Sequence, residues 1–180
     1  MYRFLTKLGI AVLLAVVIFF TTKPFFVTGA AHQVLHSFQT IGDIGSNPYS
    51  PPIYVNGTLY GVTSDGSGLG CGAIYSHNDV TEDIIGLKFF GETLGCNPHG
   101  SLTYVASENA LYGMALAGGA YNKGTIFKYN LGTGSLEGIY SFGSPELAEP
   151  DGTSPYGSLV YVEASNKLYG MTSAGGVNNG

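Results

Sequence analysis

The tripeptide Leu-Tyr-Gly occurs three times in this chain, each time after a short polar turn and before a glycine-rich loop. The copies lie 52 and then 57 residues apart, at Leu59-Tyr60-Gly61, Leu111-Tyr112-Gly113 and Leu168-Tyr169-Gly170. A period near 50 residues is typical of a repeat architecture. The tripeptide therefore constrains how the chain is built more closely than it constrains what the chain does.

Other positions keep the same period. Three phenylalanines follow one another at intervals of 52 residues: Phe38, Phe90 and Phe142. The segments 72–75 and 124–127 also match in sequence, as do 98–102 and 155–159. One sheet of a repeat protein cannot bury its faces alone and packs on the next copy. We therefore expect the phenylalanines and the Leu-Tyr-Gly residues to pack in the core rather than to contact a ligand.

Each repeat is predicted to contain four short strands. In the second copy, strands rich in Tyr, Phe, Ile, Val and Thr are expected at 101–105, 110–115, 124–130 and 136–142. Asn56-Gly57 in the first copy predicts a type I′ hairpin turn, because both central residues of that turn need a positive φ. The other two copies carry longer turns, at 106–109 and 163–166. No segment after residue 31 keeps a 3.6-residue apolar period, so the predicted fold class is all-β.

Four antiparallel strands in a repeat of about 52 residues form the plan of a propeller blade. We expect tandem blade-like repeats, forming an incomplete propeller, after an N-terminal hydrophobic helix. The predicted domains are a signal peptide or membrane anchor (1–31) and a β-repeat domain (32–180). The second domain divides into a partial repeat, two repeats and another partial repeat: 32–50, 51–97, 98–154 and 155–180.

The predicted strands are too few to close a propeller. Residues 34–38 supply one outer strand, the next two units supply full blades, and 158–172 supply the two inner strands of a third. Closed propellers typically have about 4–8 blades. We expect this chain to be a fragment of a longer repeat protein. The alternative is a short open array that pairs with another chain through its exposed strand edges.

The first 31 residues differ in character from the rest. Arg3 and Lys7 precede an uncharged apolar run at 8–20, and small residues follow at 29–31. This layout is typical of a secretory signal peptide. The alternative is an uncleaved membrane anchor, although a span needs about 20 apolar residues and Lys23-Pro24 interrupts this one. Both interpretations predict repeats outside the cytoplasm, with the membrane contacted only through this segment.

Cys71 and Cys96 are the only cysteines. An even number of cysteines in an exported chain favours a disulfide. Closing a loop of about 25 residues would stabilise the fold by about 3 kcal/mol. The alternative is a pair of free, buried thiols.

The composition argues against several classes of function. The net charge is −5, with no cluster of Lys or Arg after the N-terminus, so no nucleic-acid partner is expected. The four histidines form no helical pair of metal ligands, and the glycine-rich segment 66–72 lacks the Lys-Ser/Thr of a phosphate-binding loop. A nucleophile elbow is also missing from the sequence. We assign no catalytic, cofactor-binding or metal-ligating residue.

Several segments together resemble a known repeat. Residues 122–128, 140–142, 151–159 and 168–176 look like the repeat of the GloVer-type ("Gloeo_Verruco") tandem-repeat proteins, which are exported bacterial proteins. The resemblance covers residues 34–180, and Gly70-Cys71-Gly72 with Cys96 resembles a cysteine-bearing variant of the repeat. The resemblance to this family implies a β-propeller-like domain at or outside the cell surface. It brings no catalytic residues that could be assigned to positions of this chain. Asp151 has no counterpart in the first two repeats, so any role for it is not shared.

Two functions stay open at this point. The first is an exported, non-enzymatic β-repeat protein, secreted or in the cell envelope, that binds an unknown ligand or surface protein. Tyr49, Tyr121 and Tyr156, in loops between predicted strands, are its candidate contact residues. The alternative is a part of a secreted propeller enzyme, a lyase or hydrolase, whose active site lies outside this sequence. A single-pass anchored protein with external repeats is the alternative location.

Overall fold

The computed structural model describes residues 36–38 and 44–177, all of which belong to one compact unit. The expected hydrophobic helix and the signal peptide or anchor at 1–31 lie outside the described residues. Within the described ranges, no helix has the length and apolarity needed to cross a membrane. The described part is all-β with two short 3₁₀ turns, which confirms the predicted fold class.

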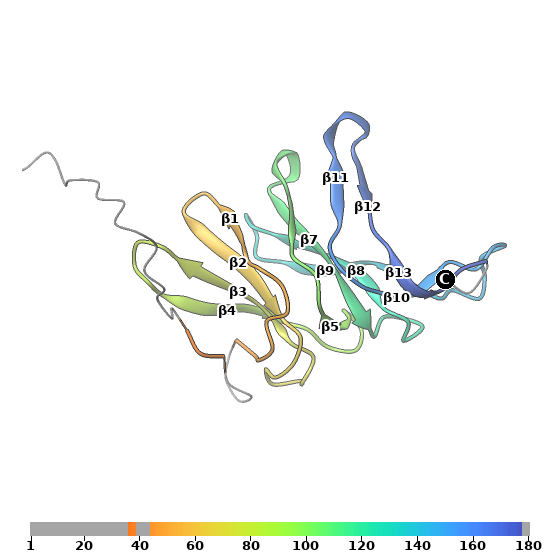
Figure 1. The fold of residues 1–180 in the computed structure, drawn as a ribbon, viewed down its shortest axis with the longest axis horizontal. Coiled ribbons are helices and arrows are strands. Elements are labelled where there is room, and N and C mark those ends of the chain that lie inside the picture. Colours follow the sequence, from red (N-terminus) through yellow and green to blue (C-terminus); the bar gives the residue numbers. More distant parts are fainter. Residues whose placement is uncertain (1–35, 39–43, 178–180) are drawn as a thin grey trace, which may run out of the picture. The chain divides into compact units, whose positions relative to one another are not determined.

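The first repeat forms a four-stranded antiparallel sheet in sequence order (Figure 1). Its strands are β1 (Ile53–Val55), β2 (Thr58–Thr63), β3 (Ala73–Asn78) and β4 (Ile84–Phe89). Asn56 and Gly57 join β1 to β2 with φ values of 48° and 85°. The type I′ turn predicted from this dipeptide is therefore confirmed.

The second repeat repeats this sheet and adds a strand to it. It contains β5 (Cys96–Pro98), β6 (Thr103–Val105), β7 (Ala110–Ala117), β8 (Thr125–Asn130) and β9 (Leu136–Ser141). The strand order is β5-β7-β8-β9, and β6 also pairs with β7. The longer predicted turn between β6 and β7 is the 3₁₀ turn η2 (Ala106–Glu108), which Asn109 ends in the left-handed conformation.

The third repeat contributes the same inner strands. β11 (Val160–Val162) pairs with β12 (Lys167–Tyr169) across the 3₁₀ turn η3 (Glu163–Ser165), and β10 (Gly152–Pro155) pairs with β13 (Thr172–Gly175). Here β12 and β13 together cover the sequence equivalent to the single strand β7 of the second repeat.

The predicted four strands per repeat omit the short strand that begins the second and third repeats, β5 or β10. In the first repeat a single bridge from Ser46 to Asp65 takes its place. The residue that follows the bridging position is left-handed in each repeat, with φ between 52° and 57°: Asn47, Asn97 and Ser154. A proline follows each of them, so the sequence there indicates a turn rather than a strand. The outer strand expected at 34–38 lies partly outside the described residues, and 36–38 carry no strand.

Two apolar clusters hold the repeats together. In the first, Val55 and Val62 of the first repeat pack with Leu102 and Leu111 of the second. In the second, Met114 and its neighbours pack with the third repeat, at Leu159, Tyr161 and Leu168. The first and second repeats thus each bury one face against the next copy, as repeat proteins do.

The periodic phenylalanines join neighbouring repeats. The ring of Phe90, just after β4, lies 4.8 Å from the ring of Phe127 on β8. The equivalent ring of Phe38 lies 5.1 Å from Tyr75 on β3 of the first repeat. A phenylalanine after one outer strand therefore contacts an aromatic residue on the third main strand of the next repeat.

Candidate functional site

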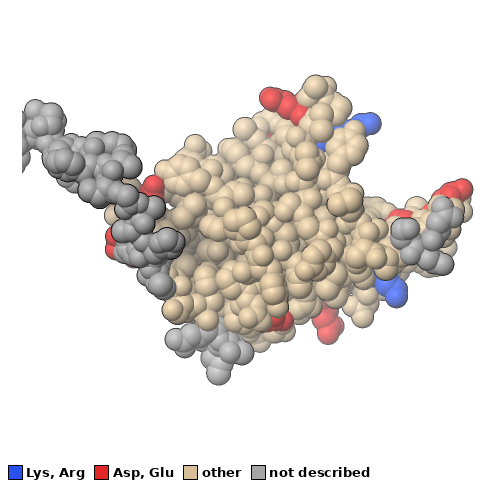
Figure 2. Space-filling view, viewed as in Figure 1, with Lys and Arg blue, Asp and Glu red and all other residues tan. Residues whose placement is uncertain are grey.

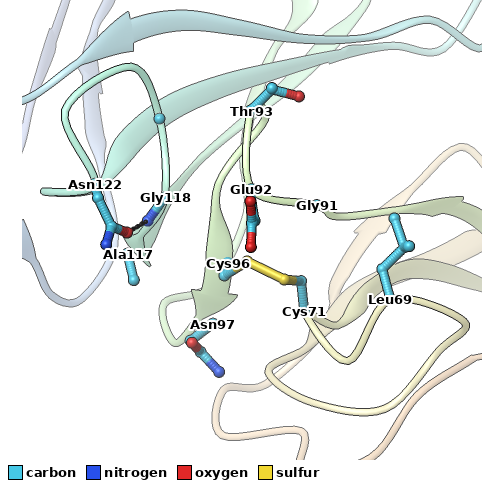
Figure 3. Close-up of a pocket in the computed structure, with 11 residues that line it drawn as sticks. Leu69, Cys71, Gly91, Glu92, Thr93, Cys96, Asn97, Ala117, Gly118 and Asn122 are labelled. Atoms are coloured by element: carbon cyan, nitrogen blue, oxygen red, sulfur yellow. Dashed lines mark hydrogen bonds between the residues drawn. A yellow bond between two sulfur atoms is a disulfide. The ribbon is translucent and has the colours of Figure 1, made fainter.

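A cleft of about 770 Å³ opens between loops of the first and second repeats (Figure 3). Three connections line it. The β2–β3 loop supplies Leu69 and Cys71, and the β4–β5 connection supplies residues 91–93. The end of β7 supplies Ala117, and the β7–β8 loop supplies Gly118, Gly119 and Asn122. Cys96 and Asn97 of β5 complete the wall. Clefts of this size are within the usual range for small-molecule sites.

A disulfide between Cys71 and Cys96 forms part of this wall. It connects the β2–β3 loop of the first repeat to β5 of the second. Beside it, the Asn97 N–H donates to the Cys71 carbonyl at 3.2 Å. In the next pair of repeats the Ser154 N–H donates to the Lys123 carbonyl at 2.8 Å in the equivalent place, without a disulfide. The cleft therefore lies at the one junction of the described repeats that is covalently tied.

The opposite wall of the cleft is held by a loop of left-handed glycines. Gly118 and Gly119 have φ values of 78° and 80°. The Gly118 N–H donates to the side-chain oxygen of Asn122 at 3.1 Å, and the Gly119 N–H donates to the Glu92 carbonyl at 2.7 Å. A Cβ on Gly118 would lie 2.7 Å from that carbonyl oxygen, so only glycine fits without a shift. These contacts fix the position of the loop that carries Asn122.

The side chains of the cleft combine apolar and hydrogen-bonding groups. Leu69, Ala117 and the disulfide are apolar, while Glu92, Thr93 and the asparagines carry polar groups. Leu69, Glu92 and Thr93 are exposed to solvent. A cleft with apolar walls and a few polar groups can orient a neutral, hydroxyl-rich ligand.

Asp65 joins the first and second repeats next to the cleft. Its carboxylate accepts hydrogen bonds from Asn47 Nδ2 at 2.8 Å, Ser64 Oγ at 2.7 Å and Asn97 Nδ2 at 3.0 Å. The bonds from Asn47 and Ser64 contribute most to holding the pKa of the Asp65 carboxyl below its ordinary value. Ala117 and Ala174 occupy the equivalent positions of the other repeats, so this carboxylate belongs to the first repeat alone.

Three rings, one from each repeat, form a row beside this carboxylate. Tyr49 stacks on His99 with ring centroids 4.5 Å apart, and His99 lies 5.1 Å from Tyr156. Each ring follows the proline after a left-handed residue, so the same local geometry places all three. Two of the candidate contact residues, Tyr49 and Tyr156, are exposed here, and His99 lies between them. Within the described ranges, the buried side-chain atoms without a hydrogen bond are all in or near this row: Ser46 Oγ, Ser50 Oγ and His99 Nδ1.

The third candidate contact residue, Tyr121, does not join this row. It lies on the β7–β8 loop next to Asn122, is exposed, and its hydroxyl accepts a hydrogen bond from Ser144 at 3.3 Å. Sequence reasoning singled out tyrosines but missed Asp65, Asn97 and the loop residues of the cleft. The row of rings could have been found from three dipeptides in the sequence, because each directly precedes one of the rings: Asn47-Pro48, Asn97-Pro98 and Ser154-Pro155.

The repeat anchors differ in burial from one repeat to the next. Leu111, Tyr112, Gly113 and Phe90 are buried, whereas Phe38, Phe142, Leu59, Tyr60 and Leu168 are partly buried. Gly61 is buried, while Tyr169 and Gly170 are exposed. The second repeat has a neighbour on both sides, which explains why its Leu-Tyr-Gly residues are the most buried of the three copies.

One ion pair lies outside the cleft. Lys128 Nζ and Glu108 Oε2 are 2.6 Å apart, and the Tyr112 hydroxyl donates to the same oxygen. The bonds from Lys128 and Tyr112 lower the pKa of Glu108, and the bond to Glu108 raises the pKa of Lys128. This contact fastens η2 to β7 and β8. Among the residues that the structure describes, no group of three His, Cys, Asp or Glu side chains could hold a metal ion.

The face shown in Figure 2 carries few charged side chains, and its basic groups are isolated from one another. This agrees with a sequence in which only 11% of residues are charged. A nucleic-acid interface needs a continuous basic stripe, and this face has none.

The family model described as Gloeobacter/Verrucomicrobia repeat matches residues 17–180. No curated protein and no solved structure matches the chain.

Proposed function

The chain belongs to the Gloeobacter/Verrucomicrobia repeat family, and we propose that it is an exported, non-enzymatic module that binds a glycan in the cleft between its first two repeats. The disulfide in the wall of that cleft carries the proposal, because it bears both on location and on binding. The family match brings no established activity with it, and the residues of the cleft support the proposed binding.

The disulfide and the N-terminal sequence support the proposed location. Disulfides persist in oxidising compartments and are rare in the cytoplasm. Cys71 and Cys96 form such a bond, and the sequence at 1–31 has the layout of an export signal. Both features favour repeats outside the cytoplasm, either secreted or held at the cell envelope by the N-terminal segment.

The lining of the cleft supports the proposed class of ligand. Its polar groups are mainly amides and a hydroxyl, with one carboxylate at Glu92, and Leu69 with the disulfide supplies an apolar surface. A sugar presents many hydroxyl groups and an apolar face on the same ring, which fits this mixture. The disulfide and the glycine loop fix opposite walls, and a preformed site loses less free energy on binding.

A glycan array probed with the full chain tests the proposal, with two matched variants. Thr93→Tyr places a ring in the cleft, whereas Thr81→Tyr makes the same change in the exposed β3–β4 turn. We expect Thr93→Tyr to weaken binding of the captured glycans at least about tenfold, or about 1.4 kcal/mol, and Thr81→Tyr to leave it unchanged.

Three results would contradict the proposal. Binding that survives Thr93→Tyr, or no binding to any glycan, removes the cleft as a sugar site. Release of new reducing ends from a bound glycan shows that the chain is an enzyme.

A further inference from the structure

The cleft between the first two repeats carries one charged side chain, Glu92. The other residues that line it are apolar, are glycines, or carry neutral amides and a hydroxyl. Figure 3 draws the Glu92 carboxylate in the middle of the lining residues, with Leu69 on one side and Asn122 on the other. Glu92 is exposed, and its carboxylate forms no hydrogen bond or ion pair with a described residue. A ligand in the cleft can therefore reach this carboxylate.

No described cation lines the cleft to balance Glu92. Lys123 is on the β7–β8 loop, but its stem lies against Gly143, where a Cβ would come 2.5 Å from the Lys123 Cγ. Asp65 adds a second negative charge one hydrogen bond away from the wall, because its Oδ1 accepts from Asn97 at 3.0 Å. Two carboxylates without a matching cation give the cleft a negative potential, which attracts cationic ligands and disfavours anionic ones.

The side-chain amide of Asn97 uses both of its N–H groups within the protein. Its Nδ2 donates to the Ser64 carbonyl at 3.1 Å and to Asp65 Oδ1 at 3.0 Å. A carbonyl and an ionised carboxylate can only accept, so these two partners fix the orientation of the amide. The group of this amide that is left for a ligand is therefore the acceptor, Oδ1.

Among the polar side-chain groups left for a ligand, acceptors outnumber donors. The Glu92 carboxylate and Asn97 Oδ1 only accept, and the Thr93 hydroxyl can do either. Asn122 supplies donors, because its Oδ1 already receives the Gly118 N–H. The hydroxyl groups of a sugar can meet these groups. An ammonium group meets them better, because it has three donors and no acceptor and its hydrogen bond to a carboxylate is charge-assisted.

We propose that the cleft selects glycans with free amino groups, and that the Glu92 carboxylate binds the ammonium group. This selectivity rests on the proposed glycan site and names the class of glycan that the site takes. A neutral sugar contacts the same walls without the ion pair, and an N-acetylated amine has lost the positive charge. A uronic acid or a sulfated sugar is repelled by the negative potential of the cleft.

Calorimetric titration of the full chain with three matched tetrasaccharides tests this selectivity. Each is a β-1,4-linked chain, and they differ only in the group at C2: the ammonium of glucosamine, the acetamide of N-acetylglucosamine, or the hydroxyl of glucose. In a buffer that keeps the amine protonated, we expect the glucosamine tetramer to bind at least about fivefold more tightly than the other two. This factor is the upper end of the range for exposed ion pairs.

Two variants that lose the same negative charge test the role of Glu92. Glu92→Gln keeps the shape of the side chain and the main-chain carbonyl that receives the Gly119 N–H. Glu82→Gln is the control, in the exposed β3–β4 turn. We expect Glu92→Gln to bind the three tetramers equally and Glu82→Gln to keep the preference. Equal losses in both variants would reflect a general attraction of cations to a chain of net charge −5 and would overturn the role of Glu92.

Three patterns of binding separate the amino preference from the glycan site itself. If the three tetramers bind equally and Thr93→Tyr weakens them all, the glycan site stands and the amino preference is wrong. If the glucosamine tetramer fails to bind while the glycan array shows other ligands, the amino preference is again wrong. If neither the tetramers nor any glycan on the array bind, both proposals are overturned.

Discussion

Gly113 on β7 lies directly opposite Phe127 on β8, and a Cβ on this glycine would come 2.3 Å from the tip of the phenylalanine ring. Gly61 stands in the same relation to Tyr75, where a Cβ would come 2.4 Å from the hydroxyl oxygen. The glycine of Leu-Tyr-Gly is therefore required by the aromatic residue across the sheet. The same ring then receives the phenylalanine of the preceding repeat, so one contact links the two periodic signals of the sequence.

Substitution of Gly113 by alanine is expected to destabilise the fold. The added methyl group overlaps the ring of Phe127, and overpacking of a core costs about 1–3 kcal/mol. Urea unfolding of Gly113→Ala measures the change. Gly68→Ala is the control, because a Cβ at Gly68 meets nothing within 4 Å, and its effect should stay within about 0.5 kcal/mol. Equal effects of the two substitutions would show that the ring does not require the glycine.

Removal of the disulfide is expected to weaken the first junction between repeats. The double variant Cys71→Ser, Cys96→Ser should lose about 2–4 kcal/mol of unfolding free energy, because the bond closes a loop with a sequence separation of 25. Thermal unfolding with and without a reductant measures the loss. Reductant should shift the unchanged chain toward the variant and leave the variant itself unaffected. A variant as stable as the oxidised chain would contradict this account.

The first two repeats each contain a buried threonine hydroxyl with the same role, but the threonine lies on a different strand in each repeat. Thr63 Oγ1 on β2 donates to the Ile44 carbonyl at 2.8 Å, while Thr125 Oγ1 on β8 donates to the equivalent Leu94 carbonyl at 2.8 Å. The cross-strand partner is an alanine in both sheets, Ala73 or Ala115. The carbonyl therefore needs one hydroxyl, which either strand can supply.

This exchange predicts a compensating pair of substitutions. Thr63→Ala alone should cost about 1–3 kcal/mol, because it removes a buried hydroxyl and leaves the partly buried Ile44 carbonyl without that donor. Adding Ala73→Thr reproduces the arrangement of the second repeat and should recover most of the loss. Chemical unfolding of the single and double variants measures the coupling. Additive losses in the double variant would contradict the equivalence of the two strands.

The Asp65 carboxyl predicts a dependence of stability on acid pH. Its pKa is lower in the folded chain than its ordinary value of 3.8, chiefly through hydrogen bonds from Asn47 and Ser64. A lowered pKa stabilises the fold above the unfolded value, and this stabilisation is lost as the pH falls through the folded value. Asp65→Asn should therefore show a flatter decline in unfolding temperature below pH 4 than the unchanged chain. Parallel declines would contradict the assignment. Glu108 titrates in both chains, so the difference between them isolates Asp65.

The sequence predicted the strands of the sheet well because turn residues and β-rich segments mark them locally. β8 and β9 begin and end within one residue of the predicted 124–130 and 136–142. The short strand β5 was missed, because Asn97-Pro98 indicates a turn. In the structure the left-handed Asn97 lets a bent segment still pair with β7.

The candidate site could be predicted only in part. Cys71 and Cys96 were identifiable as the only pair of thiols, and Tyr49 and Tyr156 as exposed loop residues. Two of the three partners of Asp65 lie 18 and 32 residues away, at Asn47 and Asn97, and nothing in the local sequence joins them to it. The cleft itself depends on how three loops from two repeats approach one another, and such tertiary packing leaves no local pattern.

The claim on which the account depends most is that the repeats fold outside the cytoplasm. Trapping of thiols in intact producing cells, with acid quenching followed by a maleimide that adds mass, tests it most directly. The account predicts that Cys71 and Cys96 are protected as a disulfide in the unchanged chain and are modified in a variant lacking residues 1–31. Two modified cysteines in the unchanged chain would contradict export and, with it, the proposed binding of an external glycan.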